Sequence, residues 1–152
     1  MNPKLELNET NLEILITSLF IGNQKLKIAA VYRTLSMNLD ENKVFVDFLR
    51  DKLSMVEKFV IIGDLNYPGI DWFSYLSNSR NLVGEENEFL SFVNENNLVQ
   101  KVHQPTRELN ILDLCLTTNE EIISELEVCE TFSTSDHNYF HFKIVINCND
   151  IS

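Results

Sequence analysis

The sequence predicts a layered α/β domain rich in antiparallel strands. Two observations carry this prediction: several apolar runs have the length and alternation of strands, and two segments repeat their apolar residues at helical spacing. With 152 residues, 44% of them hydrophobic, the chain can bury roughly 70% of the surface that it exposes when unfolded. We therefore expect a single domain over residues 1–152 with one substantial core.

The first half of the chain predicts a hairpin followed by a helix. Residues 12–21 and 26–32 are β-leaning runs, and the Gly-Asn-Gln-Lys segment at 22–25 between them is typical of a short turn. Asp40 is a suitable N-cap for a helix after this hairpin. Beyond it, apolar residues recur on one helical face, namely Phe45, Phe48, Leu49, Leu53 and Val56.

The second half begins with a continuous apolar run at 59–62, which ends at Gly63 and predicts a central strand buried on both faces. Residues 67–83 contain proline, glycine, asparagine and serine, and predict a long loop of the kind that often serves function. A second helix should bury Phe89, Phe92 and Val93. Four more strands are expected at 98–102, 111–117, 125–129 and 139–146.

Composition excludes several classes of protein. No segment approaches the roughly 18 uninterrupted apolar residues of a membrane span, and no secretory signal is recognisable, so we expect a soluble, intracellular protein without a membrane partner. The net charge of −11 argues against nucleic-acid binding through a general basic face. It is compatible with a phosphodiesterase, because carboxylates that hold a metal make a site acidic. The three cysteines lack metal-type spacing and are interpreted as reduced thiols.

Three polar motifs follow or interrupt the predicted strands, where a rigid sheet could direct them into one cleft. Gly-Asp-Leu-Asn places Asp64 and Asn66 just after a buried strand, Asp113 interrupts an apolar strand, and Ser-Asp-His brings Asp136 and His137 before the last strand. A carboxylate within an apolar strand is costly unless it is paired, and a histidine is a natural partner. Each residue alone is more simply a turn former, a satisfied carboxylate or a surface histidine, so the functional interpretation depends on their occurring together.

The order of these motifs resembles the endonuclease/exonuclease/phosphatase superfamily, and more closely the endonuclease domains of non-LTR retrotransposons. The resemblance runs from about residue 12 to residue 146 and includes Val-Tyr-Arg at 31–33, Pro-Gly-Ile-Asp-Trp at 68–72 and Gln-Pro-Thr-Arg at 104–107. It implies a DNase I-like layered β-sandwich flanked by helices. It also implies a Mg²⁺- or Mn²⁺-dependent endonuclease that cuts DNA to leave 3′-OH and 5′-phosphate ends.

The resemblance implies a role for each residue of the central motifs. Asp64 would orient or deprotonate the attacking water, and Asn66 would contact the scissile phosphate. Asp113 would hold His137 against a phosphate oxygen, and Asp136 would lie in the metal's coordination shell.

Three further residues acquire roles through the same resemblance. Tyr32 would be the active-site tyrosine at the end of its strand, although a tyrosine packed at a sheet edge is an equally good interpretation. Thr106 and Arg107 would touch the nucleic-acid backbone or brace the cleft.

The family pattern also places a strand ending in an asparagine, and a glutamate that binds the metal, before the first segment matched by this chain. We therefore expect a domain that lacks the family's first strands and has an exposed sheet edge open to self-association. Its other expected partners are the missing N-terminal segment or a reverse transcriptase domain in a longer protein. Two alternatives to the endonuclease remain: a non-catalytic remnant serving as an interaction module, and a phosphatase or RNA exonuclease on the same fold.

Overall fold

A five-stranded sheet with the order β1-β2-β3-β7-β6 forms the middle layer of the computed structural model. The structure describes residues 11–53, 58–77, 84–118, 120–129 and 139–144. β1 (Leu12–Ile21) and β2 (Gln24–Arg33) form the predicted antiparallel hairpin. The ladder extends to Gln24, so the turn contains only two residues, and Gly22 supplies the positive φ of 59° that such a turn favours.

The remaining strands of this sheet bring distant parts of the chain together. β3 (Lys58–Asp64) runs parallel to β2, and β7 (Asp113–Thr117) pairs antiparallel with β3 on its other side. β6 (Val99–Gln100) completes the sheet beyond β7. The apolar run that ends at Gly63 is therefore the central strand, as predicted.

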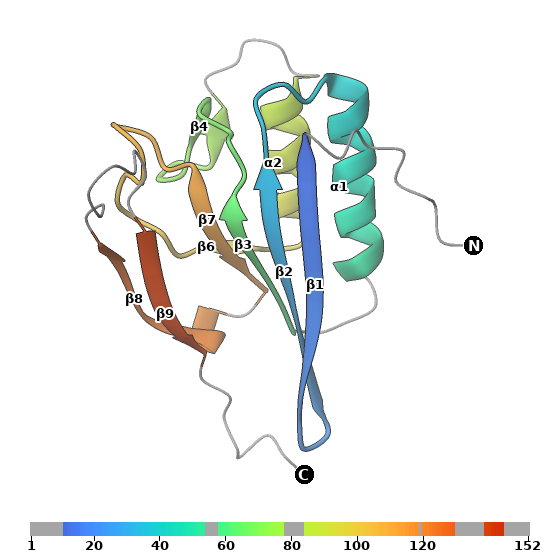
Figure 1. Ribbon diagram of the computed structural model, residues 1–152, viewed down its shortest axis with the longest axis vertical. Helices are drawn as coiled ribbons and strands as arrows, with labels where there is room; N and C mark the ends of the chain where they lie inside the picture. The colour runs from blue at the N-terminus through green and yellow to red at the C-terminus, as the bar shows by residue number, and fades with distance from the viewer. Residues whose placement is uncertain (1–10, 54–57, 78–83, 119, 130–138, 145–152) are drawn as a thin grey trace.

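Both helices cover one face of the sheet (Figure 1). α1 (Leu39–Leu53) connects the parallel strands β2 and β3, and α2 (Glu85–Glu95) packs beside it. Their apolar residues form the main core with side chains from the sheet, including Phe45, Leu49, Phe59, Ile61, Phe89 and Phe92.

The start of α1 corrects one prediction. The helix is capped by Asn38 and not by Asp40, because Asn38 Oδ1 accepts a hydrogen bond from the N–H of Glu41 at 2.9 Å. In return, Glu41 Oε2 accepts one from the N–H of Asn38 at 3.0 Å. This reciprocal pair is a capping box, which satisfies two backbone donors where a single Asp cap would satisfy one.

A second layer of strands covers part of the opposite face. β8 (Ile123–Cys129) and β9 (Tyr139–Ile144) form a two-stranded sheet, preceded by the short 3₁₀ helix η1 (Glu120–Ile122). A smaller core joins this region to the far side of the central sheet, and its buried members are Leu26, Val60, Val102, Cys115, Ile122 and Ile123. The result is the layered arrangement that the sequence predicts.

The long loop after β3 contains a small hairpin of its own, β4 (Ile70–Asp71) and β5 (Leu76–Ser77). Trp72 fixes this loop to the core, because its ring is only 5% exposed and meets Tyr75 and Phe89 edge-on. Among the described residues, no helix is both long and apolar enough to cross a membrane. Cys115 is buried and Cys129 half-buried, each as a free thiol, and Cys148 lies outside the described residues.

Candidate active site

Strand register gathers the predicted site residues into one row across the sheet. Tyr32 lies opposite Asp64 in the β2–β3 pairing, and Asp64 lies opposite Asp113 in the β3–β7 pairing. Directly opposed residues point to the same face of a sheet, with neighbouring Cβ atoms about 5 Å apart. The row lies on the face away from the helices. Three residues that are far apart in the sequence therefore meet at one end of the sheet: Asp64 and Asp113, which the motifs placed in one cleft, and Tyr32, which the family resemblance added.

The two carboxylates of this row determine its electrostatics. Asp64 and Asp113 are half-buried and lie on adjacent strands. Like charges opposed across a ladder repel each other, and a cation bound beside the pair would offset that repulsion. Carboxylate oxygens are the ligands that Mg²⁺ prefers, and it commonly binds to one or two of them together with water and phosphate. No group of three potential metal ligands occurs in the described part of the chain, so the fit to Mg²⁺ rests on this two-carboxylate pair.

The loop after β3 places Asn66 behind the row. Its φ of 53° lies in the left-handed region that asparagine tolerates better than most residues. The side chain is 8% exposed, and its Nδ2 donates a hydrogen bond to the carbonyl of Arg33 at 3.1 Å. Among the described residues no donor reaches its buried Oδ1. The carboxamide therefore retains one acceptor atom beside the end of β3.

Arg33 braces this loop from the helix side of the sheet, a role that the sequence did not reveal. Its guanidinium is fully buried and donates to the carbonyls of Leu65 at 3.3 Å and Asn66 at 3.0 Å. It also forms an ion pair of 2.7 Å with Glu85 and lies 4.0 Å from the ring centre of Tyr67. The signal in the sequence was a single arginine directly after Val-Tyr at the end of an apolar strand.

The network around Arg33 reaches both helices. Burial raises the pKa of Glu85, and the Arg33 charge opposes that rise. Burial also raises the pKa of Tyr67, whose hydroxyl donates to Asn42 Oδ1 at 2.6 Å. Asn42 in turn donates to Glu88 at 2.9 Å. The loop that carries Asn66, directly after Asp64, is thus tied to α1 and α2 through buried and partly buried polar groups.

Thr106 supports the other carboxylate of the row. It is fully buried, and its hydroxyl oxygen accepts hydrogen bonds from the N–H groups of Leu112 and Asp113, each at 3.1 Å. Thr106 therefore braces the backbone at the start of β7. It has no exposed surface with which to touch nucleic acid. Arg107 is half-buried and forms a β-bridge with Asn110. Of the two, only Arg107 has exposed surface with which to meet a phosphate.

Two predicted site residues, Asp136 and His137, lie outside the described residues. The pairing of Asp113 with His137 and the placement of Asp136 near a metal are therefore still predictions. The strand that follows them begins at Tyr139 and pairs with β8, on the side of the sheet where the row of Tyr32, Asp64 and Asp113 lies.

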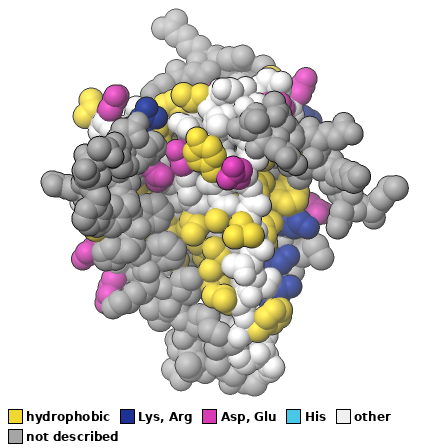
Figure 2. Space-filling model, in the orientation of Figure 1, with side chains coloured by type: hydrophobic (Ala, Val, Ile, Leu, Met, Phe, Trp, Pro, Cys, Tyr) yellow, Lys and Arg dark blue, Asp and Glu magenta, His cyan; other side chains and the backbone are white. Residues whose placement is uncertain are grey.

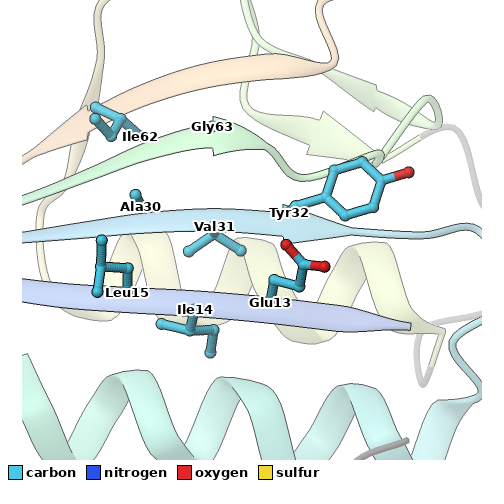
Figure 3. Close-up of a pocket in the computed structure, with 8 residues that line it drawn as sticks. All are labelled: Glu13, Ile14, Leu15, Ala30, Val31, Tyr32, Ile62 and Gly63. Carbon is cyan, nitrogen blue, oxygen red and sulfur yellow. The ribbon is translucent and has the colours of Figure 1, made fainter. Parts of the chain in front are cut away.

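A hollow of about 560 Å³ adjoins the row on the part of the sheet that β8 and β9 leave uncovered. Leu15, Ala30 and Ile62 contribute apolar walls, and Glu13 and Tyr32 line its polar end (Figure 3). Glu13 lies opposite Tyr32 and so extends the row to a fourth strand. Glu13 is not among the predicted site residues, because its place in the row follows from strand register, which local patterns do not encode. Figure 2 shows acidic side chains close to a band of hydrophobic ones on the face it displays.

The chain is similar to a known protein family and to solved structures. A family described as endonuclease-reverse transcriptase matches residues 26–141 of this chain. No curated protein matches it. The endonuclease domain of TRAS1, a telomere-specific non-LTR retrotransposon, has a similar structure, with a TM-score of 0.64 and 18% identity over 93% of this chain and 64% of that chain.

The 3′ phosphatase NExo from Neisseria, solved with a product DNA hairpin, is also similar, with a TM-score of 0.57 and 15% identity over 80% of this chain and 62% of that chain. The chain spans less than two thirds of either structure. These TM-scores establish a shared fold, the DNase I-like arrangement of layered strands and helices. Because the family match covers well over half of the 152 residues, the chain belongs to the endonuclease-reverse transcriptase family.

Proposed function

We propose that this chain carries the catalytic face of a divalent-metal-dependent phosphodiesterase that cuts DNA as a retrotransposon-type endonuclease. The observation that carries the proposal is the in-register row of Tyr32, Asp64 and Asp113 on three adjacent strands. A family match to endonuclease-reverse transcriptases supports the reaction class. The products would have 3′-OH and 5′-phosphate ends.

Asp64 is the proposed base of this reaction. It lies in the centre of the row, and it is only half-buried, so water can reach it. A carboxylate in that position accepts a proton from, or orients, the water that attacks the phosphorus in line with the leaving oxygen. The loop braced by Arg33 holds it, which reduces the reorganisation needed during attack.

Asn66 would act beside Asp64 through its side-chain oxygen, Oδ1. Its Nδ2 already donates to the carbonyl of Arg33 and its Oδ1 is buried, so the carboxamide would have to shift toward the row for Oδ1 to hold the attacking water. Contact with a phosphate oxygen, which needs a donor, would require the carboxamide to turn over. Tyr32 is 47% exposed at the row, so its hydroxyl can donate to a phosphate oxygen.

The proposed cofactor is Mg²⁺ or Mn²⁺, which would lie beside the row with Asp136 as its carboxylate ligand. When bound, the metal would neutralise charge that develops on the phosphate during the reaction. Asp113 would orient His137, whose cationic form would meet a phosphate oxygen. The DNA partner would then be attracted locally to the site, in spite of the net charge of −11. A reverse transcriptase domain in the same longer protein is the partner that the family description supports.

Nicking of supercoiled plasmid tests this proposal. With Mg²⁺ or Mn²⁺ the wild-type chain should convert supercoiled plasmid to open circles, and Asp64→Asn should lower the rate by about 100-fold or more. Asp51→Asn, an exposed aspartate on α1, is the matched control and should retain the wild-type rate. Nicking without added metal, equal nicking by Asp64→Asn, or no metal-dependent nicking by the wild type would contradict the proposal. The last result would favour a non-catalytic remnant.

The shared fold with a 3′ phosphatase makes a second substrate class testable in the same preparation. A DNA duplex with a 3′-phosphate end and no internal nick separates the two activities. Release of phosphate without cleavage of internal bonds would identify a phosphatase. Internal cleavage with 5′-phosphate ends would identify the endonuclease.

A further inference from the structure

Three lysines gather where the end of α1 lies beside the β1–β2 hairpin. Lys25 and Lys27 belong to β2, and Lys52 lies in the last turn of α1. Partial burial lowers the pKa of Lys27, the charges of Lys25 and Lys52 lower it further, and the charge of Asp51 opposes this change. The three ammonium groups are therefore close enough to repel one another. In a chain with a net charge of −11 they form a local region of positive charge.

None of these three lysines forms an ion pair within the described part of the chain. The ion pairs found there belong to other cations, namely Arg33, Lys43 and Arg50. Two of the lysines lie over aromatic rings. The Nζ of Lys25 is 5.6 Å from the ring centre of Phe20, and that of Lys52 is 5.4 Å from the ring centre of Phe48. An ammonium over a ring keeps its charge and its N–H donors, so it can still bind an anion.

The lysines of β2 lie on the helix side of the sheet, on the opposite face from the row. Side chains alternate along a strand, and Val31 belongs to the core under the helices, so Lys25 and Lys27 share its face. Phe20 pairs with Lys25 in the hairpin and lies on this face too. Seven residues, or about 23 Å of strand, separate Lys25 from Tyr32 in the row. Figure 1 shows the hairpin turn at the end of the sheet remote from the arrowheads of β2 and β3.

Phe20 adds an aromatic surface to this positive region. Its side chain is 70% exposed although Lys25 lies over the ring, so much of the ring remains open to solvent. An exposed ring lets an unpaired base stack on it, and cations beside it meet the phosphates of the same strand. Lys25 and Lys27 lie about 7 Å apart along β2, close enough to meet neighbouring phosphates. We call these groups together the lysine surface: Phe20, Lys25, Lys27 and Lys52.

We propose that the lysine surface binds single-stranded nucleic acid, with phosphates on its lysines and a base on the ring of Phe20. Charge complementarity selects this occupant, because the acidic remainder of the chain repels a polyanion and this surface attracts one. The exposed ring favours a strand with unpaired bases over a duplex, whose bases are already stacked and paired. This site needs no metal and no reaction at the row, so it goes beyond the proposed endonuclease activity.

Fluorescence anisotropy with labelled oligothymidine and oligouridine of roughly 15 nucleotides measures the binding. EDTA is present throughout, so that metal at the row cannot contribute. At about 50 mM salt the wild type should bind at least one of the two strands with a dissociation constant below about 100 µM. The tighter of the two identifies DNA or RNA as the preferred ligand. A blunt DNA duplex of the same length should bind more weakly, because its bases cannot stack on Phe20.

Two kinds of variant separate the base contact from the phosphate contacts. Phe20→Ala should raise the dissociation constant by about fivefold or more, and Phe20→Trp should restore the affinity. Replacing Lys25, Lys27 and Lys52 together by glutamine should reduce the salt slope of the affinity by about 2, since each phosphate contact contributes about 0.7. Lys25→Gln alone should weaken binding at low salt. Lys43→Gln, the same change at an exposed lysine of α1, is the control and should leave the affinity nearly unchanged.

Several results would overturn the proposal. The variants change exposed or half-buried side chains, and melting temperatures equal to that of the wild type show that they are folded. Failure of the wild type to bind either strand, or equal binding by Phe20→Ala, would then exclude the site. Asp64→Asn should bind the strand as the wild type does, and a loss as large as that of Phe20→Ala would place the strand at the row. Equally tight duplex binding would exclude the base contact, and binding only to phosphatidylserine vesicles would assign the surface to a membrane.

Discussion

Replacing Gly63 with alanine should disrupt the site and the fold together. Gly63 has a φ of 129°, a conformation that other residues rarely adopt, and a Cβ added there would lie 1.9 Å from the backbone oxygen of Val31 on the neighbouring strand. Since real Cβ contacts do not fall below 3.0 Å, β2 and β3 would have to separate by roughly 1 Å, the difference between these two distances. The strain falls directly beside Asp64 and its partner Tyr32.

The expected loss of stability is about 3–5 kcal/mol for Gly63→Ala. Unfavourable backbone conformation accounts for about 1–3 kcal/mol, and weakened pairing between two central strands accounts for the remainder. For a domain of this size the melting temperature should fall by roughly 6–20 °C. If the variant nicks DNA at all, a displacement of about 1 Å at the row should cost about 100-fold in rate.

Thermal unfolding followed by circular dichroism measures the change, with Gly69→Ala as the matched control. A Cβ at Gly69 would meet only the flexible carboxylate end of Glu86, at 3.0 Å, and its φ is not in the strained range. That variant should stay within about 1 kcal/mol of the wild type. Equal melting temperatures for Gly63→Ala and the wild type would refute the argument that β2 leaves no room at this position.

Three further changes test two supports of the row, Arg33 and Thr106, and the burial of Cys115 in the smaller core. Arg33→Met should cost about 3–5 kcal/mol in urea unfolding, because it leaves Glu85 and two loop carbonyls without their buried partner, and Arg33→Lys should recover only part of this. Burial raises the pKa of Cys115 to about 12. The folded state therefore keeps its proton above pH 9 where the unfolded chain loses it, and stability should fall by up to about 1.4 kcal/mol per pH unit between pH 9 and 12. Cys115→Ala should make this slope shallower in urea unfolding at those pH values. Thr106→Val should increase amide exchange at Asp113, which Thr106→Ser should restore; equal exchange in both variants would contradict the bracing role.

The elements were predictable because each has a local signature. The hairpin of β1 and β2 follows from two β-leaning runs with a glycine turn between them, and α1 follows from apolar residues at helical spacing. Its cap was assigned to Asp40 because the reciprocal bonding of Asn38 with Glu41 was not recognised. That error is local, and a search for asparagine followed three residues later by glutamate would have avoided it.

The candidate site was predictable only in part, because its geometry depends on contacts between distant segments. Motif order correctly brought Asp64 and Asp113 together, since both are at strand ends, and the family resemblance added Tyr32 beside them. Strand register, which no local pattern fixes, added Glu13 to the row. The burial of Arg33 likewise depends on packing between the sheet and α2, and an arginine in a strand is ordinarily expected at the surface.

Localising a bound Mn²⁺ ion by nuclear magnetic resonance tests the central claim most directly, because it does not require the chain to be active. Substoichiometric Mn²⁺ should selectively broaden the amide signals of Asp64, Leu65, Asp113 and Leu114, and Asp64→Asn should abolish this effect. The site at the strand ends predicts this pattern. Broadening confined to the acidic first turn of α2, or spread evenly over the surface, would contradict a metal-dependent phosphodiesterase site on this row.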